Sequence, residues 1–132
     1  MSDDNTQLIQ SAYEAFGRGD IPGVLAILAD DVIWNTPDIL PQTVPISGKA
    51  DVPSFFAKLS EAWDDFWLEI DDTCASGDRV CIIGRAGGTL DGGPADYGFV
   101  HAWTVRDGVA VRFDEYVDPS PALVNRAATA AA

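Results

Sequence analysis

Hydrophobic and polar residues alternate most regularly over residues 97–118, which predicts two strands joined by a tight turn. In the first of these strands, alternate positions share one face, because successive side chains of a strand point to opposite sides. That face carries Phe99, His101, Trp103 and Val105. The pattern therefore predicts an aromatic surface with a single histidine in its middle, and this surface is the first candidate for a functional site.

The turn of this hairpin decides which carboxylate of the second strand lies beside His101. A three-residue loop over residues 106–108, with glycine in the left-handed position, would place Glu115 diagonal to His101. A two-residue turn would instead place Asp114 directly opposite His101. We favour the longer loop, because it gathers the apolar residues of the second strand on the aromatic face. The predicted face then carries one imidazole and one carboxylate.

Apolar residues recur at helical spacing in three segments of the first half of the chain. They predict helices over residues 3–17, 20–29 and 50–63, and aspartates are in position to cap the first two. Residues 32–34 predict a short strand. Three prolines in residues 36–48 exclude a regular helix or a central strand there, so we predict a loop at the rim of the fold.

The later segments predict strands. Alternation over residues 66–71 is followed by a turn at 76–78 and by an apolar run over 80–85 that is typical of a central strand. Gly87-Gly88 and the turn-forming residues Asp91-Gly92-Gly93-Pro94 mark the predicted connection to the hairpin. Three helices followed by antiparallel strands indicate an α+β fold, with the helices packed on one face of a strongly curved, mostly antiparallel sheet. The expected shape is a cone whose mouth lies between sheet and helices.

Length and charge limit the classes of protein and partner. The 132 residues fit one domain, which we assign to residues 1–118, and we expect residues 119–132 to be a frayed tail. The formal net charge of -13 argues against nucleic acid or an anionic membrane as a partner. The acidic amino terminus lacks the basic and apolar regions of a signal peptide, so a cytoplasmic location is expected.

No metal or other cofactor is expected, because the two cysteines and the lone histidine do not have the spacing of metal ligands. The outer face of the curved sheet is expected to be too apolar to stay in water. We therefore predict a two-fold homodimer through this face. The residues assigned to it are Trp67, Val80, Ile82, Val100 and Ala102.

Several local strings are informative about the family of the chain. They are YEAFGRGD at residues 13–20, LADDVIW at 28–34, the glycine-to-phenylalanine segment at 48–56, GDRV at 77–80, Gly84 with Arg85, and VHAWTVRDGVAVRFDEYVD at 100–118. Together they resemble the NTF2-like fold and, within it, the SnoaL-like group of polyketide cyclases and ketosteroid-isomerase-like proteins. The resemblance covers roughly residues 8–118 and implies a cone-shaped pocket, which in this superfold serves isomerases, cyclases, dehydratases, epoxide hydrolases and binding proteins.

Only some of the catalytic residues of ketosteroid isomerase have a counterpart in this sequence. The position that matches its general base is Thr36, so that base is missing. The position of its tyrosine donor falls at Ala12, with Tyr13 one place away and turned by about 100° on a helix. The position of its second oxyanion donor matches His101.

The water-activating set of limonene-epoxide-hydrolase-like members is also incomplete. Its last-strand aspartate matches Glu115, its arginine matches Arg85, and its tyrosine matches Trp34. The second aspartate of that set would fall near Gly87 and is absent. The resemblance thus implies a pocket and a general type of chemistry rather than one reaction.

Four residues are catalytic candidates. His101 is the only group on the aromatic face that titrates near neutral pH, and Glu115 can orient it or activate water. The alternatives are a hydrogen-bonded core histidine and an ion pair of Glu115 with Arg85 or Arg112. Arg85 follows an apolar run and is expected to reach the pocket, where it would stabilise an enolate or a carboxylate. Asp38, in the proline-rich loop, could replace the missing base.

The expected substrate contacts are mostly aromatic, and Asn35 at the mouth could orient a water or a carbonyl group. Aromatic residues at these spacings are also typical of a simple core. The candidates for substrate binding are Tyr13, Phe16, Trp34, Asn35, Phe56, Trp63, Phe99, Trp103 and Phe113.

The resulting hypothesis is a small cofactor-independent enzyme that does acid–base chemistry on a small apolar molecule with a carbonyl or epoxide group. Isomerase, cyclase, dehydratase and epoxide-hydrolase reactions are the types that the resemblance implies. The alternative is a non-catalytic domain for small-molecule binding or assembly. A pocket on the order of a few hundred Å3 with His101 and Glu115 pointing into it would favour the enzyme, and a pocket filled by tryptophans would favour the alternative.

Overall fold

The structure, a computed structural model, describes residues 2–131 of the chain. In chain order the elements are α1 (Ser2–Gly17), α2 (Ile21–Leu25), β1 (Leu28–Asn35), the 3-10 helix η1 (Lys49–Asp51), α3 (Val52–Ala62), β2 (Trp63–Ser76), β3 (Arg79–Leu90), β4 (Gly93–Arg106), β5 (Val109–Pro119) and α4 (Pro121–Ala131). The first half of the described part is mostly helical, with β1 between α2 and η1, and four strands and one more helix follow.

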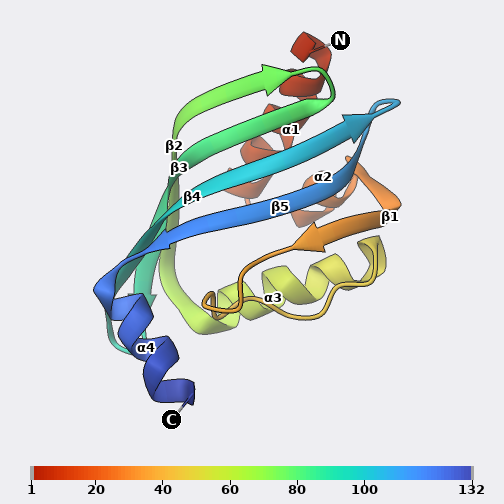
Figure 1. Cartoon of the computed structure of the whole chain (residues 1–132). Helices are drawn as coiled ribbons and strands as arrows, with labels where there is room; N and C mark the ends of the chain where they lie inside the picture. The colour runs from red at the N-terminus through yellow and green to blue at the C-terminus, as the bar shows by residue number, and fades with distance from the viewer. Residues whose placement is uncertain (1, 132) are drawn as a thin grey trace.

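The five strands form one sheet in the order β1-β5-β4-β3-β2. β1 runs parallel to β5, and all other neighbouring strands are antiparallel. Figure 1 shows the long strands bending together, with α1, α2 and α3 on the concave side of the sheet. The predicted α+β cone, with N-terminal helices on a strongly curved and mostly antiparallel sheet, is confirmed.

The second helix is shorter than predicted. Asp20 caps α2 by accepting a hydrogen bond from the backbone N–H of Gly23 at 3.0 Å. Shortly after the helix, the backbone carbonyl of Ile27 accepts a hydrogen bond from Ala110 of β5 at 2.7 Å. Pairing with β5 therefore begins where the helix was expected to continue, and β1 starts at Leu28.

The pairing of β3 with β4 decides which side chains face the helices. Ile82 lies opposite His101 and Val80 lies opposite Trp103, so all four side chains share the inner face. Val80 and Ile82 are fully buried. Our assignment of Val80 and Ile82 to the outer face is wrong, because a uniformly apolar strand gives no sign of which of its faces is the inner one.

The hairpin between β4 and β5 has a two-residue turn at Asp107 and Gly108, whose φ angles of 52° and 78° fit a type I′ turn. The register then shifts by one residue at Val111, which forms a bulge. As a result, His101 lies directly opposite Glu115. Both registers that we considered are therefore wrong. Glu115 nevertheless lies on the same face of the sheet as His101, as we predicted. A two-residue turn alone would place Glu115 on the opposite face, but the extra residue of the bulge moves it back to the face of His101.

Gly87 and Gly88 were predicted to lie in a connection, but they lie inside β3, which continues to Leu90. A Cβ atom at Gly88 would lie 2.7 Å from the backbone oxygen of Asp64, in the irregular first part of β2. Glycine here lets the two backbones approach closely while the sheet bends. The two glycines therefore contribute to the curvature that forms the cone.

In place of the expected frayed tail, the fold continues through residues 119–131. β5 ends at Pro119 and α4 follows after a single residue. Leu123 is fully buried in the core, and Arg126 forms an ion pair with Asp91 at 2.6 Å. Pro121 begins this helix, where a missing backbone N–H costs little. The domain thus extends beyond residue 118.

Candidate active site

A cavity of about 70 Å3 lies between the inner face of the sheet and the helices. That volume holds roughly five water molecules, so a ligand that enters without side-chain movement must be small. The wall is mostly apolar and aromatic. The lining residues are Ala12, Tyr13, Phe16, Val24, Trp34, Gln42, Phe55, Phe56, Leu59, Phe66, Leu68, Tyr97, His101, Trp103, Phe113 and Glu115.

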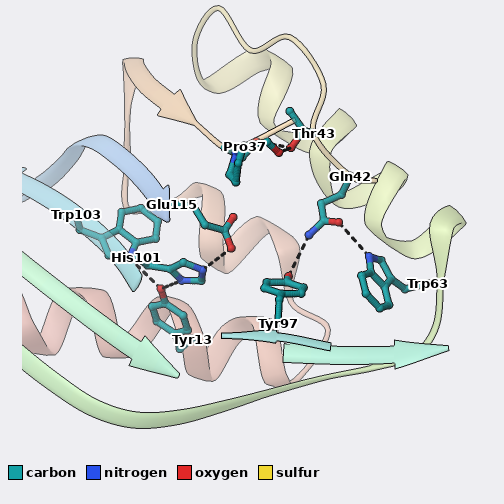
Figure 2. A network of polar contacts seen from close by, with 10 residues as sticks. Tyr13, Pro37, Gln42, Thr43, Trp63, Tyr97, His101, Trp103 and Glu115 are labelled. Carbon is teal, nitrogen blue, oxygen red and sulfur yellow. Dashed lines mark hydrogen bonds and ion pairs between the residues drawn. The ribbon is translucent and has the colours of Figure 1, made fainter. Parts of the chain in front are cut away.

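One hydrogen-bonded chain crosses the aromatic face of the cavity. His101 Nε2 lies 2.9 Å from Glu115 Oε2, and His101 Nδ1 lies 2.5 Å from the hydroxyl of Tyr13. Trp103 Nε1 donates a hydrogen bond to the same hydroxyl at 3.0 Å. Figure 2 shows this chain, which joins α1, β4 and β5.

The chemistry of the groups decides which of them donate. An indole N–H can only donate a hydrogen bond, and an ionised carboxylate can only accept one. With a neutral imidazole, Glu115 accepts the Nε2 proton and Tyr13 donates its own proton to Nδ1. Burial is the largest effect on Tyr13 and raises the pKa of its phenol, which therefore keeps its proton. Both ring nitrogens of His101 are occupied.

Glu115 is the member of this chain that has a free oxygen. Its carboxylate lines the cavity, and its side chain is only 3% exposed. His101 holds Oε2, while none of the described residues donates a hydrogen bond to Oε1. Figure 2 shows the second oxygen turned away from His101. The arrangement presents one oriented carboxylate oxygen in an apolar site, as a general base requires.

A second hydrogen-bonded chain contains two further lining residues, as Figure 2 shows. Trp63 Nε1 donates to Gln42 Oε1 at 3.0 Å, and Gln42 Nε2 donates to the hydroxyl of Tyr97 at 3.2 Å. Burial, and after it the negative charge of Glu115, raises the pKa of Tyr97. Tyr97 is therefore a neutral phenol that lies within the electrostatic reach of Glu115.

Among the side chains that the structure describes, one buried polar atom lacks a hydrogen-bond partner, and this atom is Nε1 of Trp34. The indole packs against Phe113 and Trp103, with ring centroids 4.3 and 6.0 Å away. A buried donor without an acceptor costs about 1–3 kcal/mol. An acceptor on a bound molecule would remove this cost.

Most of the predicted site residues meet at the cavity. Two aromatic candidates lie behind its wall instead: Phe99 stacks on His101 with ring centroids 4.0 Å apart, and Trp63 holds the amide of Gln42. Both support lining side chains without lining the cavity themselves. The predicted residues that line it are His101, Glu115, Tyr13, Phe16, Trp34, Phe56, Trp103 and Phe113.

Three predicted site residues lie away from the cavity. Arg85 is on the outer face of β3, where it pairs with Asp96 at 3.1 Å. Its expected place in the pocket is wrong, because β3 alternates in the opposite phase to the one we assumed. Asn35 donates a hydrogen bond to Asp114 at 2.8 Å on the outer face. Asp38 is exposed in the loop after β1 and does not line the cavity.

The sequence reasoning missed Gln42 and Tyr97, which supply the second chain. Tyr97 lies on the same alternation as Phe99 and His101, and that signal could have identified it. Gln42 lies in the irregular proline-rich loop, where no periodicity indicates the direction of a side chain. The other lining residues that were not predicted are Ala12, Val24, Phe55, Leu59, Phe66 and Leu68.

In residues 2–131, no three His, Cys, Asp or Glu side chains gather in a group that could hold a metal ion. No helix in the same range is long and apolar enough to span a membrane.

The model of the SnoaL-like domain family matches residues 9–113 of this chain. A search of curated proteins found no match. Among solved structures, an NTF2-like protein of unknown function from Burkholderia pseudomallei is 35% identical, with a TM-score of 0.78 over 87% of this chain and 91% of that one. An NTF2-like protein from Burkholderia thailandensis is 27% identical, with a TM-score of 0.83 over 94% and 96% of the two chains.

A further similar structure is that of TerC, co-crystallized with polyporic acid. It is 31% identical to this chain, with a TM-score of 0.77, and the match covers 87% of this chain and 92% of TerC. The matches extend over nearly the whole length of each relative.

Proposed function

The chain belongs to the SnoaL-like domain family, and on that basis we propose that it is a cofactor-independent enzyme that moves protons on a small apolar carbonyl compound. Isomerisation, cyclisation and dehydration all begin with such a proton transfer. An epoxide substrate is less well supported, because no arginine or lysine lines the cavity in the described part of the chain.

The observation that carries this proposal is the state of Glu115. His101 holds one carboxylate oxygen, and the other is free in an apolar cavity. Such an oxygen can take a proton from a carbon next to a carbonyl group, and the electron pair of the broken C–H bond then forms an enolate. The protonated carboxyl group can return the proton to the same or another carbon. His101, with both nitrogens occupied, orients Glu115 in this scheme.

TerC gives independent support for a small-molecule ligand. That protein was co-crystallized with polyporic acid, and it is 31% identical to this chain. On this likeness we propose that this chain also binds a small molecule.

A second candidate function is a non-catalytic binding domain. The observation that favours it is the volume of the cavity, about 70 Å3, which is well below the roughly 300–1,000 Å3 of typical ligand pockets. Trp34 and Trp103 occupy part of the wall. The two candidates agree on the place of the ligand and differ only in whether Glu115 transfers a proton.

Hydrogen–deuterium exchange at the α-carbon of small ketones tests the proposal. Acetophenone and cyclohexanone are incubated with the protein in heavy water, and deuterium uptake is followed by NMR. We expect wild type to accelerate exchange, and we expect Glu115→Gln to reduce the acceleration by about 100-fold or more, the size of a general-base contribution. Asp114→Asn changes the neighbouring carboxylate on the outer face and should retain the activity.

The outcome separates the two candidates. Exchange that is equally fast in wild type and in Glu115→Gln would disprove the role of Glu115. Binding of these ketones by wild type without any acceleration of exchange would favour the non-catalytic domain.

A further inference from the structure

We infer that Tyr97 is the hydrogen-bond donor that binds the carbonyl oxygen of the ligand, and that Gln42 and Trp63 hold its hydroxyl in position. This inference rests on the proposed function, because it concerns the ligand of the same cavity. It narrows the ligand to compounds that bring an acceptor oxygen to Tyr97.

Trp63 fixes the orientation of the Gln42 side-chain amide. An indole N–H cannot accept a hydrogen bond, so the amide atom that lies 3.0 Å from Trp63 Nε1 must be the oxygen. The amide nitrogen then faces the hydroxyl of Tyr97 at 3.2 Å. Gln42 is 1% exposed and Trp63 is 3% exposed, so bulk solvent has little access to these bonds.

The hydroxyl of Tyr97 accepts the hydrogen bond from Gln42, and its own proton must therefore point elsewhere. None of the side chains that the structure describes accepts that proton. The side chain is 2% exposed and lines the cavity, so a ligand is the partner that the site leaves open. A buried donor without a partner is costly, and an acceptor oxygen on a ligand recovers that cost.

Two other lining residues have a polar atom without a hydrogen-bond partner. Trp34 Nε1 is a second donor without an acceptor, and Glu115 Oε1 is an acceptor without a donor. A ketone offers an oxygen to the donors and a weakly acidic C–H to the carboxylate. A hydrocarbon leaves these donors without an acceptor. The cavity should therefore bind a ketone more tightly than a hydrocarbon of the same shape.

Acetophenone and α-methylstyrene test the inference, because they differ only in the replacement of the carbonyl oxygen by a CH2 group. Their affinities are measured by NMR titration of backbone amides. Wild type should bind acetophenone about tenfold more tightly, the effect of one good hydrogen bond. Tyr97→Phe removes only the hydroxyl and should lose this preference, while its affinity for α-methylstyrene stays unchanged. Tyr116→Phe is the matched control, because Tyr116 is 62% exposed.

Trp63→Phe tests the positioning roles, because it frees the amide of Gln42 to turn. The preference for acetophenone should fall several-fold in this variant. A purely structural effect would weaken the binding of both ligands equally and leave their ratio unchanged. If Tyr97→Phe does not fold, the ratio of the two affinities in Trp63→Phe decides the inference.

Equal affinity of wild type for the two ligands, or an undiminished preference in Tyr97→Phe, would overturn the inference. Failure here is distinguishable from failure of the proposed function. Glu115→Gln should keep the preference for acetophenone while losing exchange. Wild type that prefers acetophenone through Tyr97 but does not accelerate exchange would support Tyr97 as the donor to the ligand. The same result would refute the proposed enzymatic activity.

Discussion

Two adjacent carboxylates of β5 have opposite environments. Glu115 faces the cavity and is hydrogen-bonded by His101 alone, whereas Asp114 on the outer face accepts hydrogen bonds from Asn35 and Arg112, each at 2.8 Å. Burial by itself would raise the pKa of Asp114, but the hydrogen bonds from Arg112 and Asn35 outweigh it and lower the pKa. Asp114 is therefore held as an ion and joins β5 to β1.

A pH-dependent contribution to stability follows from the lowered pKa of Asp114. A lowered pKa means that the stabilisation is fully present above the ordinary value of about 4 and is lost as the pH falls through the lowered value. We expect Asp114→Asn to reduce the free energy of unfolding by about 1 kcal/mol near neutral pH. The difference between the variant and wild type should shrink below a pH of about 4. Urea denaturation at both pH values measures it, and a difference that does not change with pH would contradict the argument.

At the residue scale, the sequence could reveal side chains that lie on regular strands. His101 and Glu115 were found because alternation places them on one face, and the structure brings their side chains within 2.9 Å. Gln42 could not be found in this way, because its position depends on a loop whose path is set by tertiary contacts. Arg85 was misplaced, because the phase of β3 depends on its neighbour and not on its own pattern.

At the scale of elements, the hairpin shows what composition alone cannot decide. Val109, Ala110 and Val111 are all apolar, so either face of the strand tolerates them and the bulge leaves no mark in the pattern. The short α2 has a similar origin, because its end is set by the pairing of β1 with β5. Helix and strand types follow from periodicity, whereas their ends and registers follow from their partners.

The contribution of α4 can be measured through its one core residue. Leu123 is fully buried, so Leu123→Ala should lower the free energy of unfolding by about 2–5 kcal/mol through lost burial and a new cavity. Val124 on the same helix is 44% exposed, and Val124→Ala should change stability by about 0.5 kcal/mol or less. Denaturant unfolding compares the two variants. Equal, small effects would mean that α4 is not docked on the sheet.

At the scale of the whole molecule, Trp67, Val100 and Ala102 lie on the outer face of the sheet, as assigned for the predicted dimer. Val80 and Ile82, which we also assigned to this face, are instead buried in the core. Val100 lies opposite Tyr116 in the middle of this face. The large apolar side chains exposed on it are Ile33, Trp67 and Tyr116, which are 48%, 38% and 62% exposed.

We propose that two copies pair through this outer face, because an apolar sheet surface that joins β1, β5, β4 and β2 is costly to leave in water. Light scattering should give twice the chain mass of 14.1 kDa at micromolar concentration. Val100→Arg places a charge in the middle of the face and should shift the protein to monomers. Val124→Arg puts the same charge on the exposed side of α4 and should leave the dimer intact. A wild-type monomer, or a dimer that survives Val100→Arg, would show that this face is not the interface.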